Sequence, residues 1–542
     1  MNPPHASSTP AQAAQAASTA STAQAPSSPA PSASTSSREG HPLTRPATRP
    51  SPEAASAPVP VAVAHGDGIG PEIMDAVLSL LRQAEARIEI HPIEVGRAVY
   101  EQGHSAGITP DAWATLRRTG VLLKAPITTP RGKGYKSLNV TIRKSLGLFA
   151  NVRPCPTFHP FIHTTHPGMD LVVIRENEED TYGGIEHQQT PEVTQCLKLI
   201  TRPGSEKIAR YAFEYARQHE RKKVTCLVKD NIMKVTDGLF HEVFDAIAAD
   251  YPDIESEARI IDIGAAKIAK DPTRFDVVVL PNLYGDIVSD IAAEIAGSVG
   301  LAGSANIGQR CAMFEAVHGS APDIAGQGVA NPSGLLHAAI LMLDHIGQTA
   351  PAQALHNAWL RTIEDGVLTA DLAPPDADRQ TVGTDDFARA VADRLGHEPR
   401  TLEPAVHHAA GWRPDQPARE KKPRPVKQLV GVDVFLDWDQ AARDPNVLGA
   451  DLEHLARPDF QLKMITNRGT KVYPDGQPET FCTDHWRCRF RPAVKPNAGP
   501  GTRHEKILAL LGRLNTHGYD VIKTENLYNF DGRPGFSLGQ GE

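Results

Sequence analysis

Apolar strand-like runs alternate with amphipathic helical stretches between Val59 and Gly396, and this alternation is the strongest constraint on the fold. Val59–Ala64 is a predicted buried strand, residues 66–70 form a glycine-rich turn, and Pro71 begins a predicted helix with apolar residues at helical spacing. Further buried strands are expected at 171–174, 224–228 and 277–280. Strands that alternate with helices in this way indicate an α/β domain over 59–396.

The segments on either side of this domain differ from it in composition. Residues 1–58 are mostly Ala, Ser, Thr, Pro and Gln, so they cannot bury enough apolar surface to offset the entropy of ordering. We predict a disordered tail there, with a transit peptide as the alternative. Residues 397–429 are rich in Pro, His, Lys and Arg and are a predicted linker. Strand-like alternation resumes near Val430 and predicts a separate α+β domain over 430–542.

Composition argues against several classes of protein. The net charge of −8 gives no electrostatic reason to expect nucleic acid as a partner. The 6 cysteines form no CxxC pair, which disfavours a disulfide framework or a zinc ribbon. Because no apolar run reaches the length of a membrane span, we expect no membrane segment. A cytoplasmic location is predicted, or an organellar matrix if the tail is a transit peptide.

The glycines at 66, 68 and 70 follow a strand and precede a helix, as in the Rossmann dinucleotide-binding motif. That motif requires two residues between its second and third glycines, whereas Ile69 alone separates Gly68 from Gly70. We therefore predict a structural turn here, which disfavours dinucleotide binding of the Rossmann type.

Polar residues interrupt two otherwise apolar segments of the domain. They are Ser137, Asn139, Arg143, Arg153 and Arg175. A guanidinium group binds a carboxylate through two hydrogen bonds, so several arginines together fit a polycarboxylate. A hydroxyl and an amide would complete such a site. For each arginine taken alone, a surface ion pair is the alternative.

Two aspartates with helical spacing suggest a metal site. Asp286 and Asp290 lie four positions apart, so on a helix their carboxylates project from one face. A divalent cation would remove their repulsion, and oxygen ligands favour Mg²⁺ or Mn²⁺. Asp262, in the strand-like stretch RIIDIG, is a candidate third ligand. A solvated helix face is the alternative explanation for the pair.

Lys229 and Tyr182 are candidates for proton transfer. Lys229 follows a predicted buried strand, at the kind of strand end where active-site side chains of α/β folds emerge. Tyr182 follows an acidic run. A lysine near other cations and a tyrosine able to exchange a proton would form an acid/base pair. Solvation of a strand end and packing are the alternatives.

Together these segments resemble the β-decarboxylating dehydrogenases, the family of isocitrate, 3-isopropylmalate, homoisocitrate and tartrate dehydrogenases. The resemblance extends from Val59 to about Gly396 and depends on motifs that occur in the family's order: GDGIGPE, LKAPITTP, SLNVTIR, NVRP, IRENEEDTYGG, DNIMK, NLYGDIVSD, EAVHGSAPDIAG and ANP. It implies the family's own α/β fold and a metal-assisted oxidative decarboxylation that uses a nicotinamide dinucleotide.

The resemblance also implies roles for the residues above. Substrate carboxylates would be bound by Ser137, Asn139, Arg143, Arg153 and Arg175, and the metal by Asp286 and Asp290. The family takes Lys229 and Asp262 from the other subunit, which implies a homodimer with shared active sites. Lys229 would help deprotonate the C2 hydroxyl, and Tyr182 would protonate C3.

The same resemblance also indicates the substrate and the cofactor. The polar Ser137 and Asn139 favour isocitrate over a substrate with a branched alkyl group, because buried polar groups left unpaired are costly. Residues that resemble the family's dinucleotide site are Thr128, Thr129, His318, Gly319, Asp323, Ile324 and Asn331. An Asp at 323, where NADP enzymes tend to have Lys followed by Tyr, favours NAD over NADP.

The C-terminal segment resembles an extension of one subgroup of isocitrate dehydrogenases. A dehydrogenase of a related acid, or a regulatory subunit without activity, is the alternative.

Overall fold

A computed structural model describes residues 57–129, 137–373, 381–408, 423–493 and 503–539. The predicted disordered tail lies outside the described residues except for its last two positions, and about half of the predicted linker also lies outside them. Within the described ranges, no helix has both the length and the apolar character needed to cross a membrane.

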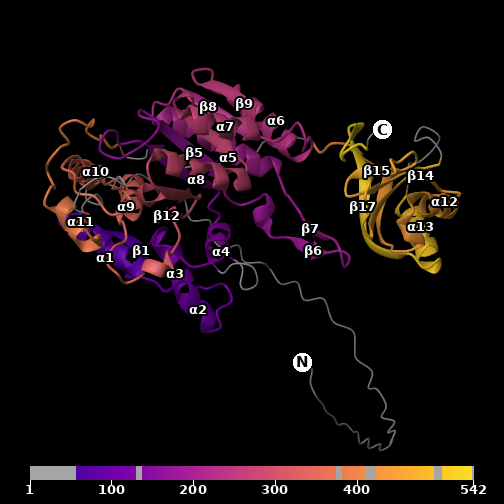
Figure 1. Ribbon diagram of the computed structural model, residues 1–542, viewed down its shortest axis with the longest axis horizontal. Helices are drawn as coiled ribbons and strands as arrows, with labels where there is room; N and C mark the ends of the chain where they lie inside the picture. Colours follow the sequence, from indigo (N-terminus) through magenta and orange to yellow (C-terminus); the bar gives the residue numbers. More distant parts are fainter. Residues whose placement is uncertain (1–56, 130–136, 374–380, 409–422, 494–502, 540–542) are drawn as a thin grey trace, which may run out of the picture. The chain divides into compact units, whose positions relative to one another are not determined.

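A ten-stranded sheet organises the region before residue 408 (Figure 1). Its strands, in spatial order, are β2 (Ile88–Pro92), β1 (Val59–Ala64), β3 (Val121–Lys124), β12 (Ala312–Ala316), β11 (Gly303–Ile307), β4 (Ala150–Pro156), β5 (Asp170–Glu176), β10 (Val277–Leu280), β8 (Lys223–Val228) and β9 (Glu255–Ile260). The strands at each end of this order run parallel, whereas β11 and β4 pair antiparallel with their neighbours. The sheet therefore consists of two parallel halves joined through antiparallel pairs.

Helices pack around this sheet, as the α/β prediction requires. They include α1 (Gly70–Gln83), α2 (Arg97–Glu101), α3 (Pro110–Thr119), α4 (Leu138–Ser145), α5 (Arg202–Gln218), α6 (Thr236–Ala248), α7 (Ile261–Lys270), α8 (Asn282–Ala296), α9 (Ser333–His345), α10 (Thr349–Glu364) and α11 (Thr384–Ala392). The buried strands predicted from apolar runs are confirmed at β1, β5, β8 and β10. Parallel strands covered on both faces are continuously apolar, which is why these runs could be recognised.

The turn before α1 requires glycine. Gly66 and Gly68 have φ values of +66° and +62°, and a Cβ at Gly68 would lie 2.0 Å from the carbonyl oxygen of Ser320. Only glycine accepts this conformation and this close approach. The prediction of a structural turn is therefore confirmed.

The secondary structure expected around Asp262 was wrong. Strand β9 ends at Ile260 and α7 begins at Ile261, so Asp262 lies in the first turn of a helix. A short apolar run cannot distinguish the end of a strand from the start of a helix. An acidic residue in a first helical turn also interacts favourably with the helix dipole.

Residues 427–534 contain a second, antiparallel sheet with its own core. The strand order is β15 (Thr470–Tyr473), β14 (Phe460–Asn467), β16 (His485–Pro492), β13 (Lys427–Asp437), β17 (Asp520–Phe530) and β18 (Arg533–Pro534). Helices α12 (Pro445–Ala456) and α13 (His504–Thr516) contribute Leu452 and Leu510 to a core that also contains Trp486 and Phe490. The prediction of a small α+β C-terminal domain is confirmed.

Candidate active site

Arginines and aspartates predicted to bind substrate and metal lie together. Arg153 on β4 and Arg175 on β5 share one face of the sheet, because Arg175 pairs with Asn151 and Arg153 with Val173. Helix α8 crosses this face closely, since a Cβ at Gly285 would lie 2.5 Å from Cγ of Arg175. Arg153 donates to Asp290 at 2.9 Å and lies 3.5 Å from Asp286, to which Arg175 also donates. The helix predicted for the two aspartates is confirmed.

The charges in this cluster shift one another's pKa values. Burial opposes ionisation of Asp286, but Arg175 and Arg153 outweigh burial and lower its pKa. Burial raises the pKa of Asp290, and the neighbouring Asp286 adds to this effect. Burial, reinforced by Arg153, lowers the pKa of Arg175 to about 10. Guanidinium groups held this close together favour additional anions at the site.

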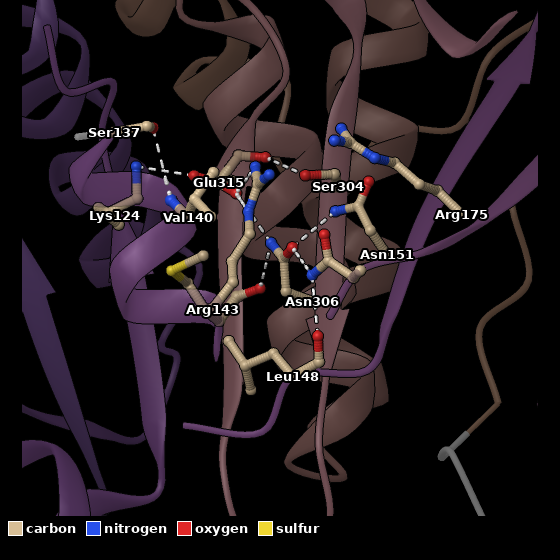
Figure 2. A network of polar contacts seen from close by, with 12 residues as sticks. Lys124, Ser137, Val140, Arg143, Leu148, Asn151, Arg175, Ser304, Asn306 and Glu315 are labelled. Carbon is tan, nitrogen blue, oxygen red and sulfur yellow. Dashed lines mark hydrogen bonds and ion pairs between the residues drawn. The ribbon is translucent and has the colours of Figure 1, made fainter. Parts of the chain in front are cut away.

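Arg143, on α4, belongs to a buried network that the sequence did not reveal (Figure 2). It donates to Glu315 at 2.7 Å, and Lys124 pairs with the second oxygen of Glu315 at 2.7 Å. Glu315 stands directly opposite Lys124 in the β12–β3 register. Both cations outweigh the burial of Glu315 and hold its pKa far below the usual range. A charged residue inside an apolar strand was the available signal.

The same network continues to Arg153. Asn306 donates to Glu315 at 2.9 Å and accepts from Asn151 at 2.8 Å, directly opposite in the β11–β4 register. Asn151 in turn accepts from Nε of Arg153 at 2.6 Å. A continuous chain of buried side chains therefore connects Arg143 with Arg153.

Tyr182 also reaches the cluster. It lies in the short 3-10 helix η2 (Thr181–Gly183), its hydroxyl donates to Asp286, and the guanidinium carbon of Arg175 lies 4.8 Å from its ring centroid. Burial raises the pKa of Tyr182, and Asp286 adds to the rise while Arg175 opposes it. Tyr182 therefore keeps its proton at neutral pH.

Lys229 and Asp262 pair with each other at 2.7 Å rather than with the cluster. Among the described residues, no three His, Cys, Asp or Glu side chains are grouped as a metal site, so one chain does not bring Asp262 together with the two aspartates of α8. Large apolar side chains are exposed near both groups, notably Ile232 at 69%, Ile263 at 48% and Ile287 at 54%.

The remaining predicted substrate residues lie at the start of α4. Ser137 caps the helix by accepting from the backbone N–H of Val140 at 3.5 Å, and its hydroxyl lies 3.4 Å from that of Thr129. The side-chain oxygen of Asn139 is buried and has no hydrogen-bond partner in the described structure. A buried polar atom without a partner is compatible with a ligand site.

Several residues predicted to bind dinucleotide lie beside the glycine turn. Thr128 donates from its backbone to Asp67 at 2.8 Å, and its hydroxyl contacts Ser320 at 2.8 Å, next to His318 and Gly319. His318 has a buried ring nitrogen without a partner among the described residues, and burial lowers its pKa. Asn331 donates to Asp371 at 3.0 Å.

Asp323 and Ile324, from which the cofactor was predicted, are exposed in the 3-10 helix η5 (Pro322–Ile324). Glu72 accepts hydrogen bonds from the backbone of Gly326, at 3.1 Å, and Ala330, at 3.2 Å, and so fixes the segment that follows. Glu72 was not among the residues predicted from the sequence.

Comparison with known proteins extends over both sheets. Residues 60–391 match the model of the isocitrate/isopropylmalate dehydrogenase family, and residues 427–542 match that of the C-terminal domain of bacterial isocitrate dehydrogenase. A Rickettsia bellii protein named isocitrate dehydrogenase (NADP) is 54% identical over 89% of this chain and 99% of its own length. A crystal structure of a Thermus thermophilus protein has 42% identity and a TM-score of 0.83, covering 89% of this chain and 96% of that one.

The predicted preference for NAD over NADP is wrong. Relatives that match 89% of the chain, from Rickettsia bellii and Thermus thermophilus, are named as NADP enzymes. An Arabidopsis thaliana relative named as a mitochondrial NAD catalytic subunit is 44% identical but matches only 63% of this chain. The prediction gave decisive weight to Asp323, yet an exposed carboxylate changes the energy of a charge 4 Å away by only about 1 kcal/mol in water. With both the fold and the motifs accounted for, this chain belongs to the isocitrate/isopropylmalate dehydrogenase family.

Proposed function

We propose that this chain catalyses the oxidative decarboxylation of isocitrate to 2-oxoglutarate with NADP, assisted by Mg²⁺ or Mn²⁺. The main support is the arrangement of Arg143, Arg153 and Arg175 around Asp286 and Asp290. Isocitrate carries three carboxylates, and guanidinium groups are the side chains best suited to bind them in pairs of hydrogen bonds.

Each arginine is fixed before substrate binds. Arg143 is fixed by Glu315, Arg153 by Asn151, and Arg175 by Asn282, which accepts from Nε at 3.0 Å and from Nη2 at 2.8 Å. Groups fixed in advance do not have to be ordered by the ligand, and this preserves binding energy for orienting the substrate. Ser137 and Asn139 would then contact a distal carboxylate.

The donor set fits a hard divalent cation. Asp286 and Asp290 present carboxylate oxygens from one face of α8, and Asp262 of the partner subunit would supply a third. When bound, the cation would stabilise negative charge on the substrate oxygens, and NADP would accept the hydride from C2. Thr128, Thr129, His318, Gly319, Asp323, Ile324 and Asn331 remain the proposed contacts for the dinucleotide.

Proton transfer is assigned to Lys229 and Tyr182. Lys229 of the partner subunit would take the proton of the C2 hydroxyl. Tyr182 would deliver its proton to C3 after carbon dioxide leaves, and its raised pKa keeps that proton available. A homodimer explains why Lys229 and Asp262 pair apart from the cluster, and the exposed Ile263 and Ile287 provide apolar surface for its interface.

Steady-state kinetics test the reaction. With Mg²⁺ and NADP, isocitrate should be converted with a kcat/KM at least about 10-fold above that for 3-isopropylmalate, homoisocitrate or tartrate, since each unpaired buried polar group costs roughly 1–3 kcal/mol. NADP should be preferred to NAD. A protein that leaves isocitrate unchanged with either coenzyme would refute the proposal.

Mixing two inactive variants tests the shared site. Tyr182→Phe and Lys229→Met should each be inactive, but a heterodimer of the two contains one site with both residues intact. Random exchange of subunits should therefore restore about a quarter of the sites. Mixing two separate preparations of Tyr182→Phe is the control. No recovery despite proven subunit exchange would show that Tyr182 and Lys229 act from the same chain.

A further inference from the structure

Lys198 lies between two aspartates that are completely buried. Its ammonium nitrogen is 2.8 Å from Asp237 and 3.6 Å from Asp180, whose side chains are both 0% exposed. It also lies 4.4 Å from the ring centroid of Tyr284 and 3.4 Å from its hydroxyl. In the described part of the chain, Lys198 is the one cationic side chain paired with either aspartate. A buried carboxylate without a compensating cation is strongly unfavourable.

Asp180 holds the turn that carries Tyr182. One of its carboxylate oxygens accepts from the backbone N–H of Thr181 at 2.8 Å, and the other accepts from that of Leu283 at 2.9 Å. Leu283 lies in the first turn of α8, the helix that carries the metal-site aspartates. Asp180 has φ of +64° and ψ of −155°, a backbone conformation that non-glycine residues rarely adopt unless the surroundings enforce it. The Asp180 carboxylate therefore fixes Tyr182 relative to α8.

Asp237 has the same role for Lys229 that Asp180 has for Tyr182. Its carboxylate accepts from the backbone N–H of Lys229 at 2.7 Å, and Asp237 itself lies in the first turn of α6. Asp237 thus fixes the main chain at the point where the strand β8 ends and the Lys229 side chain emerges.

We propose that Lys198 is a positioning residue for both proton-transfer groups, Tyr182 and Lys229, which it holds through the buried carboxylates of Asp180 and Asp237. The proposal depends on the roles proposed above for Tyr182 and Lys229. In a dimer with shared sites, Tyr182 and Lys229 of one chain serve different active sites. Lys198 would then connect the two sites physically, because one ammonium group compensates an aspartate at each.

Three substitutions separate positioning from simple stability. Lys198→Met removes the charge, Lys198→Gln keeps a hydrogen-bond donor, and Lys198→Arg keeps both. Lys223→Met is the matched control, because Lys223 is also mostly buried, 19% exposed, and pairs with two acidic residues, but it lies at the start of β8, at the opposite end of the strand from Lys229. For each protein we would measure isocitrate affinity with Mg²⁺ by calorimetry, kcat with NADP, and the exchange of C3 protons of 2-oxoglutarate into deuterated water.

Lys198→Met should bind isocitrate nearly as well as the unmodified protein, because the arginines are untouched. Its kcat and its C3 exchange, both per binding site, should fall by about 10²-fold, the usual effect of misplacing a catalytic group. Lys198→Arg should keep most of the kcat and C3 exchange of the unmodified protein, and Lys198→Gln should lie between Lys198→Arg and Lys198→Met in both. If Lys198→Met does not fold, the comparison of Lys198→Gln with Lys198→Arg tests the proposal instead.

The positioning role is overturned if Lys198→Met keeps the kcat per binding site of the unmodified protein. If Lys198→Met does not fold, the same result for Lys198→Gln overturns it. It is also overturned if the kcat of Lys198→Arg is no higher than that of Lys198→Gln. An unmodified protein that is inactive on isocitrate would instead overturn the proposed function, and this inference with it.

Discussion

Replacing Glu315 by Gln should test whether the buried network around Arg143 depends on charge. The substitution keeps the size of the side chain but removes its negative charge. Lys124, 1% exposed, and Arg143, 12% exposed, would then face each other without the carboxylate that each contacts at 2.7 Å. Removing one partner of a buried ion pair typically costs roughly 3–5 kcal/mol, because an uncompensated charge remains.

The loss should depend on pH in a defined direction. Burial already lowers the pKa of Lys124, and Glu315 is the main influence that opposes this. Without Glu315 the folded variant should release the Lys124 proton more readily than the unfolded chain does. The unfolded state then binds more protons, so the stability of the variant should increase with pH and the defect should shrink in alkaline solution.

Urea denaturation followed by far-UV circular dichroism measures this effect. Glu255→Gln is the control, because Glu255 is 66% exposed and pairs with Lys223 at 3.1 Å. Losing this contact should cost only about 0–1 kcal/mol, because Glu255 is largely solvated and Lys223 keeps its second partner, Glu257, at 3.0 Å. If Glu315→Gln at pH 7 loses no more stability than this control, the carboxylate is not needed to compensate Lys124 and Arg143, and the reasoning is wrong.

Two further substitutions and one titration test other charged groups of the protein. Burial raises the pKa of Glu176 from 4.5 to about 7, so the folded state holds its proton more tightly and the contribution of Glu176 to stability should fall by roughly 3 kcal/mol from pH 4.5 to 7. Denaturation measured across that range should show that Glu176→Gln lacks this contribution. Asp290→Asn should raise the Mg²⁺ concentration needed for half-maximal activity by at least about 10-fold, and an unchanged requirement would exclude Asp290 as a ligand. Calorimetric titration should show tighter isocitrate binding with Mg²⁺ than without it, and equal affinities would argue against a shared site.

Local patterns were sufficient for many elements. The strand β10 is a run of four apolar residues, and Asp286 and Asp290 lie on the helix that their spacing indicated. These features depend on residues close together in the chain, where periodicity is informative.

The buried network around Glu315 could not be predicted from the sequence, because it depends on residues far apart in the chain. Lys124 ends the run VLLK and Glu315 lies within AMFEA, and neither segment indicates which strand will be its neighbour. Their pairing follows from the β12–β3 register, between segments almost two hundred residues apart. The cofactor prediction failed because it considered only Asp323 and Ile324, whereas dinucleotide preference depends on all charges that surround the phosphate.

The arrangement of charges also explains how the site can be stable without its ligands and still bind them. In the structure, Arg153 and Arg175 pair with Asp290 and Asp286, so the arginines and the proposed metal ligands compensate one another. Isocitrate would replace the aspartates as partner of the arginines, and the cation would replace the arginines as partner of the aspartates. The cation alone would leave the buried arginines without an anion, and isocitrate alone would leave the two partly exposed aspartates next to each other without a cation. Each ligand should therefore increase the affinity for the other by the same factor, as thermodynamic linkage requires.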